Sequence, residues 1–345
     1  MTKKRRQKQW HKGAFKAGID SARSFDSSEM NKLRLVDSLQ QLNMRWGTWF
    51  TKQKFKNIPR DNYSAACHQF LHGYRSTAEV NVSAELLPPT PKKVGCIISA
   101  VDEHETLQKQ LDELRRLTLE EVIVVLNGSS AELLRIVREH PIGATIVYYQ
   151  EPLGYDVGRA VGARASSSDI LLFLDSDMIV DADQLLPFIY EVEKGADVVL
   201  NPITPLFPPN CSDWDSVSNM KYFLNLCLGR KDLLASSLTA VPHALSRRAV
   251  ETIGPDVLAV PPLAQARALR AGLTVTNAPV IVDVIKKNLI REHNVGANNS
   301  VEQLIVGDHL EAIHDSFLEL GDRLLFPDRI RRRDLLREGD EEIGF

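Results

Sequence analysis

The sequence ILLFLDSDMIV at residues 170–180 indicates a buried strand that ends in two carboxylates. Its first five residues are all apolar, as expected of a strand that is covered on both faces of a parallel sheet. Asp175 and Asp177 follow at once, and ligands of open α/β sheets bind beyond the carboxyl ends of the strands. Because a buried unpaired charge is costly, two carboxylates one residue apart need a partner there. A divalent cation, which prefers oxygen ligands, is a suitable one.

Segments of strand and helix character alternate around this stretch. Apolar runs at 94–101, 121–126 and 144–149 predict three strands upstream of it, separated by helical segments. Downstream, 183–194 predicts a helix and 197–200 predicts a fifth strand. This β-α-β-α order predicts an α/β fold with a doubly wound, mostly parallel sheet and right-handed crossovers.

The alternation weakens after residue 202, where a proline-rich loop begins. Further elements are still expected from the apolar spacing. They are an apolar helical region at 215–235, helices at 246–254, 263–272 and 301–320, and short strands at 274–277 and 279–284.

Before the first strand, residues 30–75 have helical spacing, and 83–93 contains three prolines in four positions, which predicts a stiff linker.

The composition, 43% hydrophobic and 25% charged, is that of a soluble globular protein. No apolar run reaches the ~18 residues that a bilayer requires, which excludes a membrane-spanning class. The four cysteines form no CxxC pair, which excludes a zinc ribbon and fits a reducing cytosol. The basic start lacks an apolar segment behind it, so we expect no secretory signal and a cytoplasmic protein.

The charge is distributed unevenly along the chain. Residues 1–93 hold 18 Lys and Arg against 7 Asp and Glu, whereas residues 94–345 hold 24 against 38. A basic segment attached to an acidic body indicates contact with something anionic, and a nucleic acid, a membrane surface and the body itself are candidates. A solvated segment that only keeps the protein soluble is the alternative.

Four further sites follow the predicted strands. The first strand ends in Ser99-Ala100-Val101-Asp102-Glu103, and Asn127 ends the second strand before Gly-Ser. Arg159 precedes Gly162 after the third strand, and Asp175 and Asp177 form a D-x-D motif after the fourth.

In this order, the motifs resemble those of the family 2 glycosyltransferases, nucleotide-sugar-dependent enzymes of the GT-A fold. The resemblance covers residues 94 to about 293. It implies a metal-dependent enzyme that takes a nucleotide-diphosphate sugar, with a UDP-sugar favoured, and a glycan, a lipid-linked molecule or a protein as acceptor. The cofactor that it implies is Mn²⁺ or Mg²⁺.

The resemblance also implies roles for individual residues. Asp177 is the expected catalytic residue and metal ligand, and His293 is expected as a second metal ligand after the late strand. The expected contacts of the nucleotide-sugar are Ser99, Ala100, Val101, Glu103, Asn127, Arg159, Asp175 and Ser176.

One departure from the family pattern concerns the catalytic base. Inverting members usually have an acidic pair before an Arg and a Gly, and Val260 and Pro261 stand at that place here. Asp256 is the nearest acid and is the candidate base. Another base, a retaining mechanism, or a degenerate protein that binds nucleotide-sugar or glycan without turnover remain as alternatives.

Five segments are therefore expected. They are a basic, mobile arm at 1–29, a helical extension and linker at 30–90, a nucleotide-sugar-binding half at 91–200, an acceptor-binding half at 201–295, and a C-terminal helix with a charged tail at 296–345. Contact of the arm with an anionic membrane at the inner face is a further expectation.

Other functional classes fit less well. The segment after the first strand lacks the glycines of a G-x-G-x-x-G motif, which argues against an NAD-binding Rossmann enzyme and a sugar nucleotidyltransferase. A P-loop is absent from the sequence. The basic arm contains no recognised RNA-binding module, so we expect no nucleic acid partner.

Overall fold

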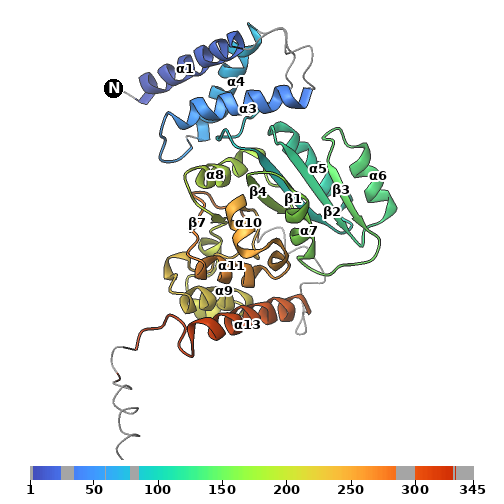
Figure 1. Cartoon of the computed structure of the whole chain (residues 1–345), viewed down its shortest axis with the longest axis vertical. Helices are drawn as coiled ribbons and strands as arrows, with labels where there is room; N and C mark the ends of the chain where they lie inside the picture. Colours follow the sequence, from blue (N-terminus) through green and yellow to red (C-terminus); the bar gives the residue numbers. More distant parts are fainter. Residues whose placement is uncertain are drawn as a thin grey trace, which may run out of the picture.

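The computed structural model describes residues 3–24, 35–58, 60–77, 85–284, 300–328 and 331. A layer of N-terminal helices lies at one end of the molecule, the sheet lies in the centre, and helix α13 (Ser300–Leu320) lies at the opposite end (Figure 1). The expected fold class, an α/β sheet with a helical N-terminal extension and a C-terminal helix, is confirmed. Among the described residues, no helix combines the length and the apolar character needed to cross a membrane.

Within the described residues, the central sheet has seven strands in the order β3-β2-β1-β4-β6-β5-β7. The strands are β1 (Val94–Ala100), β2 (Glu121–Asn127), β3 (Thr145–Tyr149), β4 (Ile170–Asp175), β5 (Val198–Leu200), β6 (His243–Ser246) and β7 (Val275–Asn277). All neighbours are parallel except β6, which is antiparallel to both β4 and β5. The prediction of a mostly parallel sheet is confirmed, and β6 is a strand that was not predicted.

Helices cover both faces of the sheet. Alternate residues of a strand point to opposite faces, so Ile98 packs in one hydrophobic core and Ile97 in the other. The first core holds α5 (His104–Arg116), α6 (Ala131–Glu139) and α8 (Ala182–Glu193). The second holds α7 (Val157–Ala165), α9 (Ser216–Cys227), α10 (Arg247–Ile253) and α11 (Pro261–Arg270). The sheet is therefore doubly wound, as expected.

Two glycines let α7 lie directly on β1. A Cβ atom added at Gly158 would be 2.4 Å from Ser99 Oγ, and one at Gly162 would be 2.3 Å from Ile97 Cγ2. Both distances are too short for any side chain, so only glycine allows this close approach. The contact fixes the position of Arg159, which lies between the two glycines on the same helix.

The N-terminal layer consists of α1 (Lys3–Arg23), α3 (Leu35–Thr51) and α4 (Arg60–Arg75). Its buried aromatic side chains continue into the first core, where the rings of Phe50 and Tyr190 lie 5.4 Å apart. Helix α1 crosses α4 closely, because a Cβ added at Gly18 would meet the carbonyl of Phe70 at 2.0 Å. The expectation of a mobile arm at 1–29 is therefore wrong for Lys3–Arg23, which form a packed helix.

The prediction of a strand at 279–284 is also wrong. The backbone of this segment forms hydrogen bonds with a side chain and not with a neighbouring strand. Asn201 Nδ2 donates to the carbonyl of Val282 at 2.8 Å, and Val282 N donates to Asn201 Oδ1 at 3.0 Å. A buried amide has thus taken the hydrogen bonds that a neighbouring strand would otherwise make.

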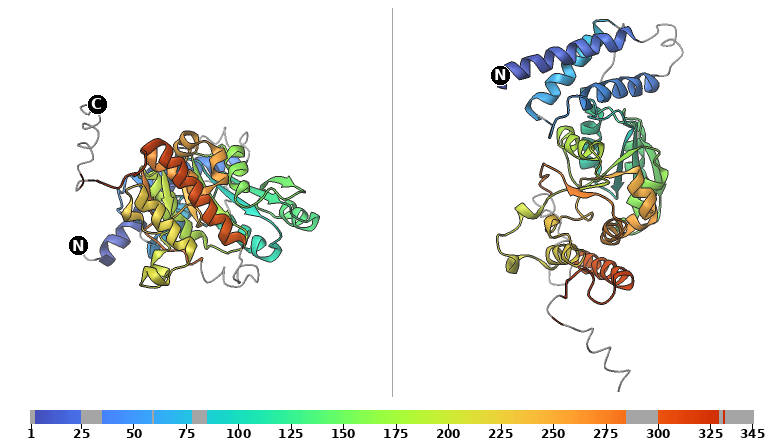
Figure 2. Two further views of the ribbon diagram at one scale, coloured as in Figure 1. Left: turned by 90° about the horizontal axis from the view of Figure 1, so that it is seen from below. Right: turned by 60° about the vertical axis from the view of Figure 1, so that its left-hand side comes forward.

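Helix α13 packs against α9 and α11, as the two views of Figure 2 also show. Asp315 accepts hydrogen bonds from Arg267 (3.2 Å) and from Arg270, and Arg270 Nε lies 3.0 Å from Glu319. These ion pairs and the packed faces hold the last described helix on the body of the molecule.

Candidate active site

A cavity of about 910 Å³ lies beyond the carboxyl ends of β1 and β4. One wall comes from the loop after β1, the start of α7 and the end of β4, and the other comes from residues 203–208, α9, 239–241 and the start of α13. Its lining is strongly acidic. Among the described residues, the charged side chains that line it are Glu103, Asp156, Asp175, Asp177, Asp215, Glu302, Arg159 and Lys221.

The structure places both aspartates of the D-x-D motif in this cavity. Asp175 is the last residue of β4 and pairs in register with Ser99 of β1, at the edge where parallel strands present their carboxyl ends. Asp177 follows two residues later in the turn. The apolar run and the motif that follows it thus have the relation that the sequence predicts.

Arg159 also lines the cavity, but two carboxylates hold its guanidinium. Its Nη2 lies 3.1 Å from Asp175 Oδ2, and its Nη1 lies 3.1 Å from Asp156 Oδ1 and donates to the carbonyl of Leu238 at 3.0 Å. Burial lowers the pKa of Arg159, but the two carboxylates outweigh it and the pKa is raised. Burial raises the pKa of Asp156, which Arg159 opposes. Arg159 therefore positions Asp175 and Asp156 at the cavity wall.

Glu103 joins the loop after β1 to the D-x-D turn. Its Oε2 accepts from Ser176 Oγ at 2.6 Å and from the backbone N–H groups of Val101 and Asp102 at 3.1 Å. Ser176 N also donates to the carbonyl of Ser99 at 3.1 Å. Glu103 and Ser176, both predicted site residues, thus link the carboxyl ends of β1 and β4.

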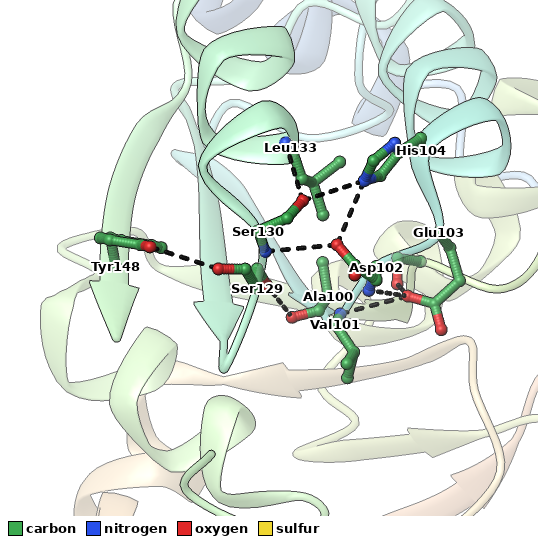
Figure 3. Close-up of polar contacts among 10 residues, drawn as sticks. Ala100, Val101, Asp102, Glu103, His104, Ser129, Ser130, Leu133 and Tyr148 are labelled. Carbon is green, nitrogen blue, oxygen red and sulfur yellow. Dashed lines mark hydrogen bonds and ion pairs between the residues drawn. The ribbon is translucent and has the colours of Figure 1, made fainter. Parts of the chain in front are cut away.

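The loops after β1 and β2 are tied together next to the cavity (Figure 3). Asp102 Oδ1 accepts from Ser130 N at 3.2 Å and contacts His104 Nε2 at 3.1 Å. Ser129 Oγ donates to the carbonyl of Ala100 at 3.2 Å. The hydrogen bonds from Ser130, with that from His104, lower the pKa of Asp102. Asp102 is therefore a structural anion that fixes these loops.

Asn127, an expected contact of the nucleotide-sugar, forms hydrogen bonds with the loop that leads into α7. Its Nδ2 donates to the carbonyl of Gly154 at 2.7 Å, and its Oδ1 accepts from Leu153 N at 2.5 Å. The amide is buried and both of its ends are used. Asn127 therefore holds the loop that leads into α7.

The remaining predicted residues lie outside the cavity lining. Ser99 and Ala100 end β1 beneath it, and Val101 is half exposed beside Glu103. Asp256 lies in the turn Pro255–Ala259, where it forms an exposed ion pair with Arg164 near the C-terminal end of α7. It is therefore not placed to take a proton in the cavity. His293 lies outside the described residues.

Among the described residues, four charged residues of the cavity were not predicted: Asp156, Asp215, Lys221 and Glu302. Lys221 had a signal in the sequence, because it is the one charged residue of the apolar helix α9. Burial lowers the pKa of Lys221 to about 8. The other three depend on how α7, α9 and α13 approach the sheet, which no local pattern shows.

The carboxylates fit a divalent cation that shares its ligands with a substrate. Within the described ranges, no group of three or more His, Cys, Asp or Glu side chains is arranged to hold a metal ion by itself. Asp175 and Asp177 supply two acidic side chains at the strand end. Mg²⁺ typically binds one or two carboxylates and completes its shell with waters and phosphate oxygens. The carboxylates of Asp175 and Asp177 therefore fit a divalent cation that completes its shell with waters and phosphate oxygens.

The protein-family model for glycosyl transferase family 2 matches residues 96–253, which include β1 to β6, α10 and the D-x-D motif. Residues 96–253 are thus similar to glycosyl transferase family 2. The matched segment includes the cavity wall formed by the loop after β1, the start of α7 and the end of β4, and α13 adds to the cavity from outside this segment. The doubly wound, mostly parallel sheet agrees with the sheet that the resemblance implied.

Solved structures of glucosyl-3-phosphoglycerate synthase from Mycobacterium tuberculosis are also similar to the chain. One is 17% identical, with 69% of this chain and 82% of that chain covered and a TM-score of 0.44. A complex of that protein with Mn²⁺, UDP and phosphoglyceric acid is 17% identical, with 69% and 80% covered and a TM-score of 0.45. Among curated proteins, no relative matches the chain.

Proposed function

We propose that this protein transfers a sugar from a nucleotide-diphosphate sugar to an acceptor, in a reaction that requires Mn²⁺ or Mg²⁺. The observation that carries the proposal is the pair Asp175 and Asp177 at the carboxyl end of β4, in an acidic cavity of about 910 Å³. A UDP-sugar is the favoured donor. The acceptor is a glycan, a lipid-linked molecule or a protein, in the synthesis of surface glycans or glycoconjugates.

Each part of the cavity then has a role in the proposed sugar transfer. Asp177 and Asp175 would hold the cation, which when bound neutralises charge on the diphosphate that leaves. Arg159 keeps Asp175 at the strand end, and Glu103 fixes the turn that carries Asp177 through Ser176. Apolar side chains of the opposite wall, among them Leu206 and Phe207, limit the access of water to the site.

A test of the metal site compares wild type with Asp177→Asn. We expect calorimetry to show Mn²⁺-dependent binding of UDP to wild type and at least a tenfold weaker affinity in the variant, since a coordinating carboxylate is lost. Asp213→Asn, in the exposed turn Cys211–Asp213, removes the same charge outside the cavity lining and should bind like wild type. Equal metal-dependent affinity in all three proteins would refute the assignment.

The second candidate function is a degenerate protein that binds nucleotide-sugar or glycan without turnover. It is favoured by Val260 and Pro261 at the place of the acidic pair and by the position of Asp256 beside Arg164. Release of UDP from a panel of UDP-sugars separates the two candidates. Metal-dependent release supports the transferase, and tight binding without release of UDP supports the degenerate protein.

We also propose that the protein is cytoplasmic and contacts anionic membranes through α1. Lys12, Lys16 and Arg23 are exposed on this helix. The described cysteines are all free thiols, as is usual in a reducing compartment.

A further inference from the structure

The charge of the cavity poses a problem for the proposed donor. The described lining includes six carboxylates and two cationic side chains, and a cleft lined by negative charge repels anions. A nucleoside diphosphate carries several negative charges, which one divalent cation does not fully balance. Arg159 is already bound by Asp156 and Asp175 and by the carbonyl of Leu238. The second cation, Lys221, is therefore the group to consider.

Lys221 lies in the middle of α9, on the wall of the cavity that faces the D-x-D motif. It is half-buried and forms no hydrogen bond or ion pair with any other described residue. The nearest acid on its own helix boundary, Asp215, uses its carboxylate to cap α9 by accepting from Ser218 N at 2.7 Å and from Ser218 Oγ at 2.9 Å. A lysine in an otherwise uncharged helix thus presents a cation to the cavity without an internal partner.

We propose that Lys221 binds a phosphoryl group of the substrate in this cavity. The assignment rests on the proposed function, because it takes the bound molecule to be a phosphorylated substrate. The diphosphate of the donor is one source of that group and a phosphorylated acceptor is the other. In both cases the ammonium group contributes a charge-assisted hydrogen bond to a phosphoryl oxygen.

The electrostatic surroundings of Lys221 give the proposal a pH signature. Burial lowers its pKa to about 8, Asp215 and Asp156 raise it, and Arg159 lowers it. From α13, His309 faces Lys221, and burial lowers the pKa of that histidine to about 4, so it is neutral near pH 7. Lys221 is therefore a cation at pH 7 and loses its proton as the pH rises through about 8. Binding of a phosphoryl group that needs this charge should weaken over that range.

The experiment measures UDP binding in the presence of Mn²⁺ for wild type, Lys221→Met, Lys221→Arg and Lys231→Met. If Lys221 binds the diphosphate of the donor, Lys221→Met should lower the affinity for UDP by about 10- to 100-fold, the effect of one hydrogen bond to a charged group. Lys231→Met removes the same charge from the exposed turn Lys231–Leu233 and should bind like wild type. Between pH 7 and pH 9 the affinity of wild type should fall, and that of Lys221→Arg should stay constant.

Inorganic phosphate distinguishes the two sources of the phosphoryl group. If phosphate displaces UDP from wild type and not from Lys221→Met, Lys221 binds the diphosphate of the donor. If phosphate binds to the complex with UDP and Mn²⁺, and Lys221→Met abolishes this, Lys221 binds a phosphorylated acceptor. The proposal is overturned if Lys221→Met retains wild-type binding of both probes while Asp177→Asn loses UDP. The proposed function itself fails if wild type shows no metal-dependent UDP binding.

Discussion

Arg159 holds two acidic side chains of the cavity in place from a buried position. Its guanidinium lies 3.1 Å from carboxylate oxygens of both Asp156 and Asp175, and 4% of its surface is exposed. Removal of one partner from a buried ion pair leaves a charge without compensation, which costs more than the pair contributes. The arginine therefore acts on the site through the residues that it positions.

We expect Arg159→Met to lower the free energy of unfolding by about 3–5 kcal/mol, because two carboxylates lose their cation. Urea denaturation followed by circular dichroism measures this loss. Arg164→Met is the matched control on the same helix, since Arg164 pairs with Asp256 at the exposed surface and should cost less than about 1 kcal/mol. Equal losses in the two variants would contradict the positioning role.

Asn127 gives a second prediction at this scale. Asn127→Ala should lower the free energy of unfolding of the ligand-free protein by about 1–3 kcal/mol, because Leu153 N and the carbonyl of Gly154 lose their partner. Thermal or urea unfolding without nucleotide is the measurement. A variant with wild-type stability but weaker UDP binding would contradict this structural role and support the expected contact with the nucleotide-sugar.

At the scale of secondary-structure elements, one carboxylate of β2 links this strand to the loop before β4. Glu121 Oε1 accepts from Ser166 Oγ (2.6 Å), Ser167 N (2.9 Å), Ser168 N (2.9 Å) and Ser168 Oγ (2.7 Å). Burial raises the pKa of Glu121, but these hydrogen bonds outweigh it and the pKa lies below its usual 4.5. The stabilisation is present above pH 4.5 and is lost as the pH falls through the lowered value.

Glu121→Gln tests this tie between elements. At pH 7 we expect the variant to be less stable by about 1–3 kcal/mol, since an acceptor in several hydrogen bonds loses its charge. Below pH 4.5 the stabilities of the variant and wild type should converge, because wild type takes up a proton there on unfolding. Parallel curves of stability against pH, measured by urea denaturation from pH 3 to 7, would refute the role of the charge.

The sequence predicts some elements well because their cause is local. The strands β1, β2 and β4 each contain a run of apolar residues, and the D-x-D motif begins at the last residue of β4. Strand β6 was missed because four residues, HALS, have no distinctive pattern and pair antiparallel between β4 and β5. The segment 279–284 has the apolar pattern of a strand, but its hydrogen bonds go to Asn201, which is distant in the chain.

The same distinction holds for the site: the sequence predicts the positions that have a local cause. Asp175 and Asp177 follow a strand, so the sequence predicts their place beyond the carboxyl ends of the strands, and both line the cavity in the structure. The partners of Arg159 and Asn127 lie on loops whose approach is set by packing, such as the glycine contacts of α7. For that reason the sequence identified these residues but not what they bind.

On the scale of the whole molecule, the N-terminal helices form a layer that shares its core with the sheet. Exposed Lys12 and Lys16 lie one turn apart on α1. Reversal of both charges to Glu should weaken binding to phosphatidylserine liposomes, since each cation near an anionic surface contributes ~1 kcal/mol. Sedimentation with liposomes at low and high salt is the measurement, and high salt should remove the difference.

Reversal of Lys109 and Lys231, which are exposed on the other parts of the molecule, changes the net charge equally and is the control. Equal sedimentation of the two double variants would show that α1 has no special role at the membrane. Point substitutions suit this test better than deletion, because α1 is packed against α4.

The position of α13 has a consequence for the order in which the site is completed. Val301, Glu302, Leu304 and Ile305 line the cavity, although the sheet and the aspartates are encoded well before them. A nascent chain of which only residues 1–284 have left the ribosome therefore has the strands and the D-x-D motif but lacks the part of the cavity wall that α13 supplies. Substrate would meet an open acidic surface on such a nascent chain, and an enclosed site arises only when synthesis has passed α13.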